Sequence, residues 1–127
     1  MRKTYLIHAR IIDGVRDTAI EDGILVFTTN LTAQKGGRCD KIDFVGEMSE
    51  CADFPSKVNR EDVVVDMTGY SITPGLYNVH AHLGLSMPYK PFRFDEMGVP
   101  YRSMLMMRRA CEALDCGITT IRSAGGP

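Results

Sequence analysis

Two histidines separated by one small residue, His80 and His82, constrain this chain more than any other feature. They follow Pro74-Gly75 and a short apolar run, a pattern that predicts a buried β-strand. Residues two apart in a strand project from the same face, with backbones about 6.5–7 Å apart at a rise of ~3.3 Å per residue. Imidazoles at that separation can both bind one divalent ion at ~2.0–2.1 Å from each nitrogen. The end of this strand is therefore a candidate metal site.

Several short strands are predicted before the histidines. They cover residues 4–12, 24–27, 42–46, 63–65 and 70–72, with polar loops at 28–38 and 47–60. Strands at this spacing are typical of a small antiparallel sheet or a β-sandwich. His8, the third histidine, has no ligand set beside it, and we interpret it as a partly exposed strand residue. We assign residues 1–72 to a small β-sandwich-type domain.

A strand-helix-strand unit is predicted next. Residues 76–82 form its first strand, 84–98 a loop with Pro and aromatic residues, 100–116 a helix that ends before Gly117, and 118–122 a second strand. The loop either shapes a substrate pocket or packs on its own domain. This order predicts a right-handed parallel crossover. We assign residues 73–127 to the first βαβ portion of an incomplete α/β, TIM-like barrel.

The predicted helix has two contrasting sides. The apolar side recurs at steps of three and four, and we interpret it as core packing: Met104, Met107, Ala110, Cys111 and Leu114. The opposite, polar side carries Arg108, Arg109, Glu112 and Asp115.

A bare H-x-H pair also fits hydrogen-bonded histidines in a core, because short motifs give false matches. The surrounding pattern is much longer. It follows D-x-x-G-x-x-x-x-P-G-L-x-(D/N)-x-H-x-H through Asp66, Gly69, Pro74, Gly75, Leu76, Asn78, His80 and His82. This string resembles the signature of the metal-dependent amidohydrolase superfamily. A second run resembles L-x-x-G-x-T-T-x-R-D-x-G-G, through Leu114, Gly117, Thr119, Thr120, Arg122, Gly125 and Gly126. The second run is most similar to the imidazolonepropionase-like and prolidase-like branch.

The resemblance implies hydrolysis of amide or related C–N bonds, including cyclic amides, in small molecules. It implies a β-sandwich built from both chain ends and a (β/α)₈ barrel with one or two divalent ions, often zinc. His80 and His82 would be paired ligands of the more buried ion. Ser123 stands where many relatives have Asp, which puts any role of that carboxylate in doubt, and Asn78 replaces a commoner Asp. The other ligands and the catalytic aspartate belong to later barrel strands, so the general base is expected beyond residue 127.

The length of the chain bears on this expectation, because a complete barrel takes ~250 residues. The residues after Ile72 suffice for two strands and one helix. We therefore expect an N-terminal fragment of a hydrolase that is inactive alone and retains metal weakly. The alternative is a non-catalytic truncated product, or a subunit that must assemble with a second polypeptide. A stand-alone sandwich module does not explain the histidine string.

Charge and composition limit the classes of partner expected for this chain. Lys and Arg total 15 against 16 Asp and Glu, a balance that argues against nucleic acids and acidic membrane surfaces. Neither a membrane span nor a signal-peptide core is apparent, which predicts a cytoplasmic protein. The small-molecule substrate is what the resemblance implies. The sequence leaves open whether a full-length form is a homo-oligomer. Cys39, Cys51, Cys111 and Cys116 have no C-x-x-C spacing, and we interpret them as reduced thiols.

Overall fold

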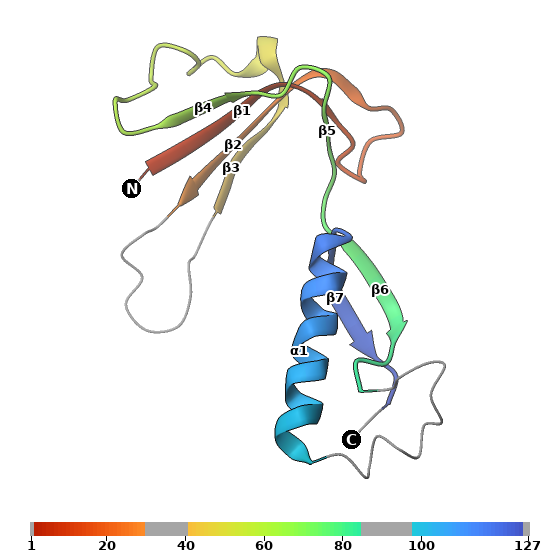
Figure 1. Cartoon of the computed structure of the whole chain (residues 1–127). Helices are drawn as coiled ribbons and strands as arrows, with labels where there is room; N and C mark the ends of the chain where they lie inside the picture. The colour runs from red at the N-terminus through yellow and green to blue at the C-terminus, as the bar shows by residue number, and fades with distance from the viewer. Residues whose placement is uncertain (1, 30–40, 85–97, 126–127) are drawn as a thin grey trace. The chain divides into compact units, whose positions relative to one another are not determined.

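The computed structural model describes residues 2–29, 41–84 and 98–125, which form two compact units, the sheet unit Met1–Pro74 and the helix unit Gly75–Pro127 (Figure 1). The sheet unit contains β1 (Arg2–Ile11), β2 (Ile20–Thr29), β3 (Lys41–Glu47), η1 (Met48–Glu50), β4 (Val63–Asp66) and β5 (Ser71–Ile72). The helix unit contains β6 (Leu76–Ala81), α1 (Val99–Asp115) and β7 (Ile118–Ser123). Each predicted strand and the predicted helix is present. The prediction that the histidine strand is buried is wrong for the described chain, because Leu76, Tyr77 and Val79 of β6 are 54%, 72% and 69% exposed. No helix in these ranges has the length and apolar character needed to cross a membrane.

The sheet unit is one mixed sheet in the order β3-β2-β1-β4, with β5 also paired to β1. β1, β2 and β3 are antiparallel neighbours, whereas β4 and β5 run parallel to β1. The prediction of an antiparallel sheet is therefore wrong for β4 and β5. The cause is the connection between β3 and β4, residues 48–62, which carries the chain to the far side of β1, as a parallel pairing requires.

The same connection covers one face of the sheet. Tyr5 and Val26 are paired across β1 and β2 and share that face. Cys51 is buried with them, and Phe54 packs against the cluster with its ring centroid 5.8 Å from that of Tyr5. The sequence predicts only a surface loop here. The structure differs because the apolar side chains of this segment fill the core of the sheet unit.

Among core residues, truncation of Ile24 is expected to lower stability most, because this residue of β2 is 0% exposed. Ile24→Ala leaves a cavity in a packed interior and should lower the free energy of unfolding by ~2–5 kcal/mol. Urea unfolding followed by circular dichroism measures this change. Val15→Ala is the matched control, because Val15 is 87% exposed and its truncation should stay within ~0.5 kcal/mol. Equal effects at the two positions would contradict this account of the core.

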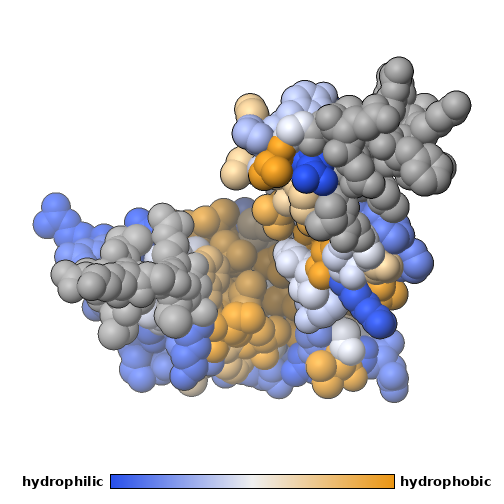
Figure 2. Space-filling view, turned by 90° about the horizontal axis from the view of Figure 1, so that it is seen from below, coloured by the Kyte–Doolittle hydropathy of each residue, from blue (hydrophilic) through white to orange (hydrophobic). Residues whose placement is uncertain are grey.

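The opposite face of the sheet is apolar and, among the described residues, only partly covered. The register pairs Leu6 with Leu25, Leu25 with Val45, and Leu6 with Val65. These four side chains therefore form a row across four strands. Val65 is 38% exposed and Ile42 62% exposed, and Figure 2 shows hydrophobic surface beside strongly hydrophilic surface. A second sheet on this row would complete the predicted sandwich, but the described part of this unit has one sheet, so the sandwich stays a prediction.

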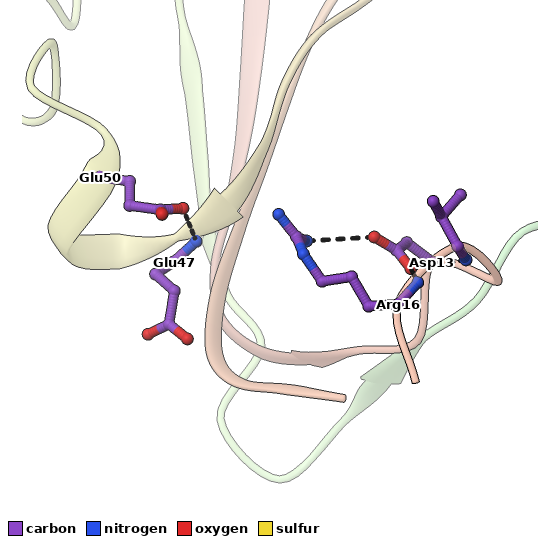
Figure 3. Close-up of polar contacts among 5 residues, drawn as sticks. Asp13, Arg16, Glu47 and Glu50 are labelled. Atoms are coloured by element: carbon purple, nitrogen blue, oxygen red, sulfur yellow. Dashed lines mark hydrogen bonds and ion pairs between the residues drawn. The ribbon is translucent and has the colours of Figure 1, made fainter. Parts of the chain in front are cut away.

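Local hydrogen bonds close the chain after β1 and after β3 (Figure 3). Asp13 Oδ1 accepts hydrogen bonds from the backbone N–H groups of Val15 and Arg16, each at 2.9 Å. Arg16 Nη1 also donates to Asp13 Oδ2 at 3.1 Å. After β3, Glu50 Oε2 accepts a hydrogen bond from the Glu47 backbone N–H at 3.0 Å. An aspartate side chain thus holds the turn after β1.

A pH-dependent contribution to stability is expected from Asp62. Its carboxylate accepts hydrogen bonds from the backbone N–H groups of Asn59, at 2.9 Å, and Lys3, at 2.8 Å. These two bonds hold the pKa of Asp62 below its ordinary value, and the bond from Asn59 has the larger effect. A lowered pKa in the folded state stabilises the fold above the unfolded-state pKa, and this stability is lost as pH falls through the folded-state pKa.

Asp62→Asn should therefore lower the urea midpoint at pH 7, and the difference from the parent should shrink below about pH 4. Midpoints measured between pH 7 and pH 3 check this. Asp17→Asn, at an exposed position of the same unit, is the control. A difference at Asp62 that is constant over this pH range would exclude an ionic origin.

In the helix unit, β6 and β7 pair in parallel, and α1 connects them and packs on β7. Pro100 is the second helical residue, where its missing N–H costs nothing. Gly117 follows the helix with φ of 78°, a left-handed conformation that confirms the predicted stop.

The face of α1 that packs differs from the predicted one. Met104, Met107 and Leu114 are 73%, 70% and 59% exposed, so their interpretation as core is wrong for the described chain. The half-covered positions are Ala110, which was predicted, and five that were not: Arg102, Leu105, Met106, Arg109 and Ala113. Both stripes recur at steps of three and four, so periodicity alone does not select the one that contacts the strands.

Some predictions fall on residues outside the described ranges. They are most of the loop at 28–38, nearly all of the aromatic loop at 84–98, and Cys39. Among the described cysteines, Cys51 is buried, Cys111 and Cys116 are exposed, and all three are free thiols.

Candidate metal centre

The end of β6 brings the two predicted ligands together. His80 lies in β6 and His82 one residue beyond its end at Ala81. Their Nε2 atoms are 3.1 Å apart, and their ring centroids are 5.0 Å apart with the planes at 70°. The two imidazoles therefore converge on one point, as the spacing of the two residues predicts.

This separation can be compared with the requirements of a shared ion. Two nitrogens ~2.0–2.1 Å from one zinc ion lie ~3.3–3.4 Å apart at a tetrahedral angle and ~2.9 Å apart at a right angle. The distance of 3.1 Å between the Nε2 atoms of His80 and His82 falls between these values. A hydrogen bond from one neutral ring to the other has the same length, so the geometry fits both states.

The other ring nitrogen of His82, Nδ1, has a hydrogen-bond partner. His82 Nδ1 lies 3.1 Å from the carbonyl oxygen of Gly125, to which it can donate its proton. This tautomer leaves a lone pair on Nε2, the arrangement usual for histidines that bind metals. Ser123 Oγ donates to the same carbonyl at 3.4 Å. The residue that replaces the commoner Asp thus touches the group that orients His82.

Two further contacts position the strand end. Asn78 Oδ1 accepts a hydrogen bond from the His80 backbone N–H at 3.1 Å. Arg109 Nη1, from α1, donates to the Leu83 carbonyl at 2.9 Å. The sequence places Arg109 on the polar side of the helix, so its role here was not predicted. No local signal distinguishes an arginine that binds a carbonyl from one that faces solvent.

The described residues do not complete a metal site. No group of three or more His, Cys, Asp or Glu side chains in these ranges is placed to hold an ion. His8 belongs to the sheet unit, where its Nδ1 lies 2.8 Å from Asp22 Oδ1. It occupies a β-bulge with φ of 58°. Its side chain is 45% exposed, so it is the partly exposed strand residue that was expected, with an added hydrogen bond to Asp22.

Comparisons with known proteins bear on the fold. No protein-family model and no curated protein matches the chain. A solved Xaa-Pro dipeptidase with methionine in its active site matches 97% of this chain, with 23% identity and a TM-score of 0.66. A prolidase complexed with N-methylphosphonate-L-proline matches 98%, with 19% identity and a TM-score of 0.72. Molinate hydrolase matches 94%, with 20% identity and a TM-score of 0.67.

The chain spans only about a quarter of these structures, namely 26%, 26% and 23% of their lengths. It is mostly sheet with one helix in its described part, and it matches the N-terminal part of amidohydrolase folds. The likeness is one of fold: the chain shares the fold of part of structures named as prolidases and as an amidohydrolase.

Proposed function

We propose that this chain forms the N-terminal part of a metal-dependent hydrolase that cleaves carbon–nitrogen bonds in small molecules. The observation that carries the proposal is the convergence of His80 and His82, whose Nε2 atoms lie 3.1 Å apart while Gly125 holds Nδ1 of His82. Paired imidazoles with an oriented tautomer suit a divalent ion such as zinc.

The two histidines would act as ligands and not as acid–base groups, because a nitrogen bound to metal has no lone pair left for a proton. A divalent ion held there would lower the pKa of bound water toward ~7 and polarise the scissile carbonyl. Zinc takes about four protein ligands, or three with water. The described residues offer two of these ligands, and we propose that later parts of a longer protein supply the remaining ligands and the general base.

The substrate class rests on fold likeness alone. The matched structures include enzymes named Xaa-Pro dipeptidase, prolidase and molinate hydrolase. We propose an amide or cyclic amide substrate on that ground. The choice among such substrates depends on later barrel loops, since specificity in barrels resides there.

Zinc titration of the 127-residue chain, followed by NMR of the imidazole protons, tests the paired ligands. Zinc should shift the signals of His80 and His82 together, with weak affinity and no hydrolase activity. Lowering the pH should weaken binding, because ligand nitrogens must be unprotonated. His82→Ala should remove the effect, whereas His8→Ala, at the third histidine, should not. Zinc shifts confined to His8 would contradict the site.

A second candidate is a non-catalytic subunit that assembles with another polypeptide. The observation in its favour is exposed apolar surface on both units. Leu76 is 54% and Val79 69% exposed in the helix unit, and Ile42 is 62% exposed in the sheet unit. Sedimentation of the purified chain, alone and mixed with a polypeptide supplying the rest of a barrel, separates the two candidates. Hydrolysis by the mixture supports the enzyme, and a stable but inactive complex supports the subunit.

A further inference from the structure

The sheet unit contains a cavity of about 390 Å³ that has no part in the proposed hydrolase. This volume lies within the ~300–1,000 Å³ typical of small-molecule sites. The apolar part of its lining includes Val26, which is 3% exposed, and Phe44 on the neighbouring strand. This part of the lining offers contact to a hydrocarbon or aromatic body.

Tyr5 lines the same cavity and is 2% exposed. Within the described ranges its hydroxyl forms no hydrogen bond. Burial raises the pKa of Tyr5, and the nearby carboxylates of Asp62 and Asp53 raise it further, so the phenol stays neutral. No buried side-chain polar atom of the described residues lacks a partner, so the Tyr5 hydroxyl meets the open space of the cavity, where a ligand can hydrogen-bond to it.

The charged residues around the cavity have an excess of negative charge. Asp43, Glu50 and Asp53 contribute carboxylates, against one ammonium from Lys3. Asp43 accepts a hydrogen bond from Thr28 and Asp53 pairs with Lys57, yet both keep unused acceptor positions. These carboxylates are not placed to hold a metal ion, since the described residues contain no such group of three. A larger cation can reach groups that are farther apart.

We infer that this cavity binds a small organic ammonium ion with an apolar body. Its N–H groups donate to the carboxylates of Asp43 and Asp53 and to the oxygen of Tyr5, and its body lies against Val26 and Phe44. Aromatic rings add attraction for a cation. Nothing in this site draws on His80 or His82, so its test is independent of the proposed hydrolase.

Titration of the 127-residue chain with benzylammonium, followed by amide NMR shifts, tests the inference. Benzyl alcohol and phenylacetate are the uncharged and anionic comparisons, and benzylammonium should bind at least about 10-fold more tightly than either, because hydrogen bonds between charged groups are the stronger ones. Tyr5→Phe keeps the ring and should weaken binding by about 10-fold. Asp43→Asn, at an exposed carboxylate, should weaken it about 2–5-fold.

Glu61→Gln is the matched control, because this exposed carboxylate of the same unit does not line the cavity. It should leave the affinity unchanged. Equal binding of benzyl alcohol would overturn the inference, as would shifts spread over the acidic surface that Tyr5→Phe and Asp43→Asn leave unaltered. Should Tyr5→Phe unfold, Asp43→Asn alone decides between a site and diffuse charge attraction.

Discussion

On the proposed function, alanine at His80 or His82 should remove most bound metal from a longer protein that contains this chain and should abolish the proposed hydrolase activity. The Nε2 atoms of these residues converge at 3.1 Å, so either substitution removes one of two adjacent ligands. The loss should exceed the ~10–100-fold that follows when only an outer-shell partner is removed. Metal content of the purified variants and kcat/KM on amide substrates measure the effect.

His8→Ala is the matched control for both variants. It removes a histidine whose Nδ1 pairs with Asp22 in the sheet unit, and it should leave metal content and turnover unaltered. Circular dichroism establishes that each variant is folded. Retained metal and full turnover in His80→Ala and His82→Ala would overturn the assignment of these residues as ligands.

Gly75→Ala is expected to destabilise the pairing of β6 with β7. A Cβ at residue 75 would lie 2.0 Å from Thr119 Oγ1, 2.4 Å from its Cγ2 and 2.7 Å from its Cβ. Rotating the Thr119 side chain does not relieve an overlap that includes its own Cβ. Overpacking costs ~1–3 kcal/mol, and this overlap belongs at the upper end. Urea unfolding gives the stability change, and NMR shifts of the β6 amides report whether the strand moves.

Two further variants show whether crowding is the cause. Thr119→Gly combined with Gly75→Ala should recover part of the loss, because the crowded atoms are gone. At Gly98 the nearest atom to an added Cβ is Pro100 Cδ at 3.8 Å, so Gly98→Ala should cost clearly less. Equal losses at residues 75 and 98, or no recovery in the double variant, would exclude steric overlap.

The position of Gly75 next to β6 also links this glycine to the candidate metal site. Gly75 lies immediately before β6, and the Leu76 backbone N–H donates to the Gly117 carbonyl at 2.9 Å. A displaced strand start would carry His80 with it. We therefore expect Gly75→Ala to weaken zinc binding by His80 and His82 as well as to lower stability.

The sequence by itself determined the elements and the meeting of the two histidines. Strand alternation places residues two apart on one face, and this local rule holds to the end of β6. Gly117, with φ of 78°, and the aspartate turn after β1 are likewise set by their own chemistry. Such features depend on neighbours along the chain, so periodicity and residue type suffice to predict them.

Only the tertiary structure decided which faces are used. It made β4 and β5 parallel to β1, covered Tyr5 with residues 48–62, and turned Met104 outward while Arg109 bonded to Leu83. It also placed the Gly125 carbonyl against His82. Each of these outcomes joins residues far apart in sequence. Their energies depend on which surfaces meet, and a pattern that fits two faces of a helix or two directions of a strand carries no information on that choice.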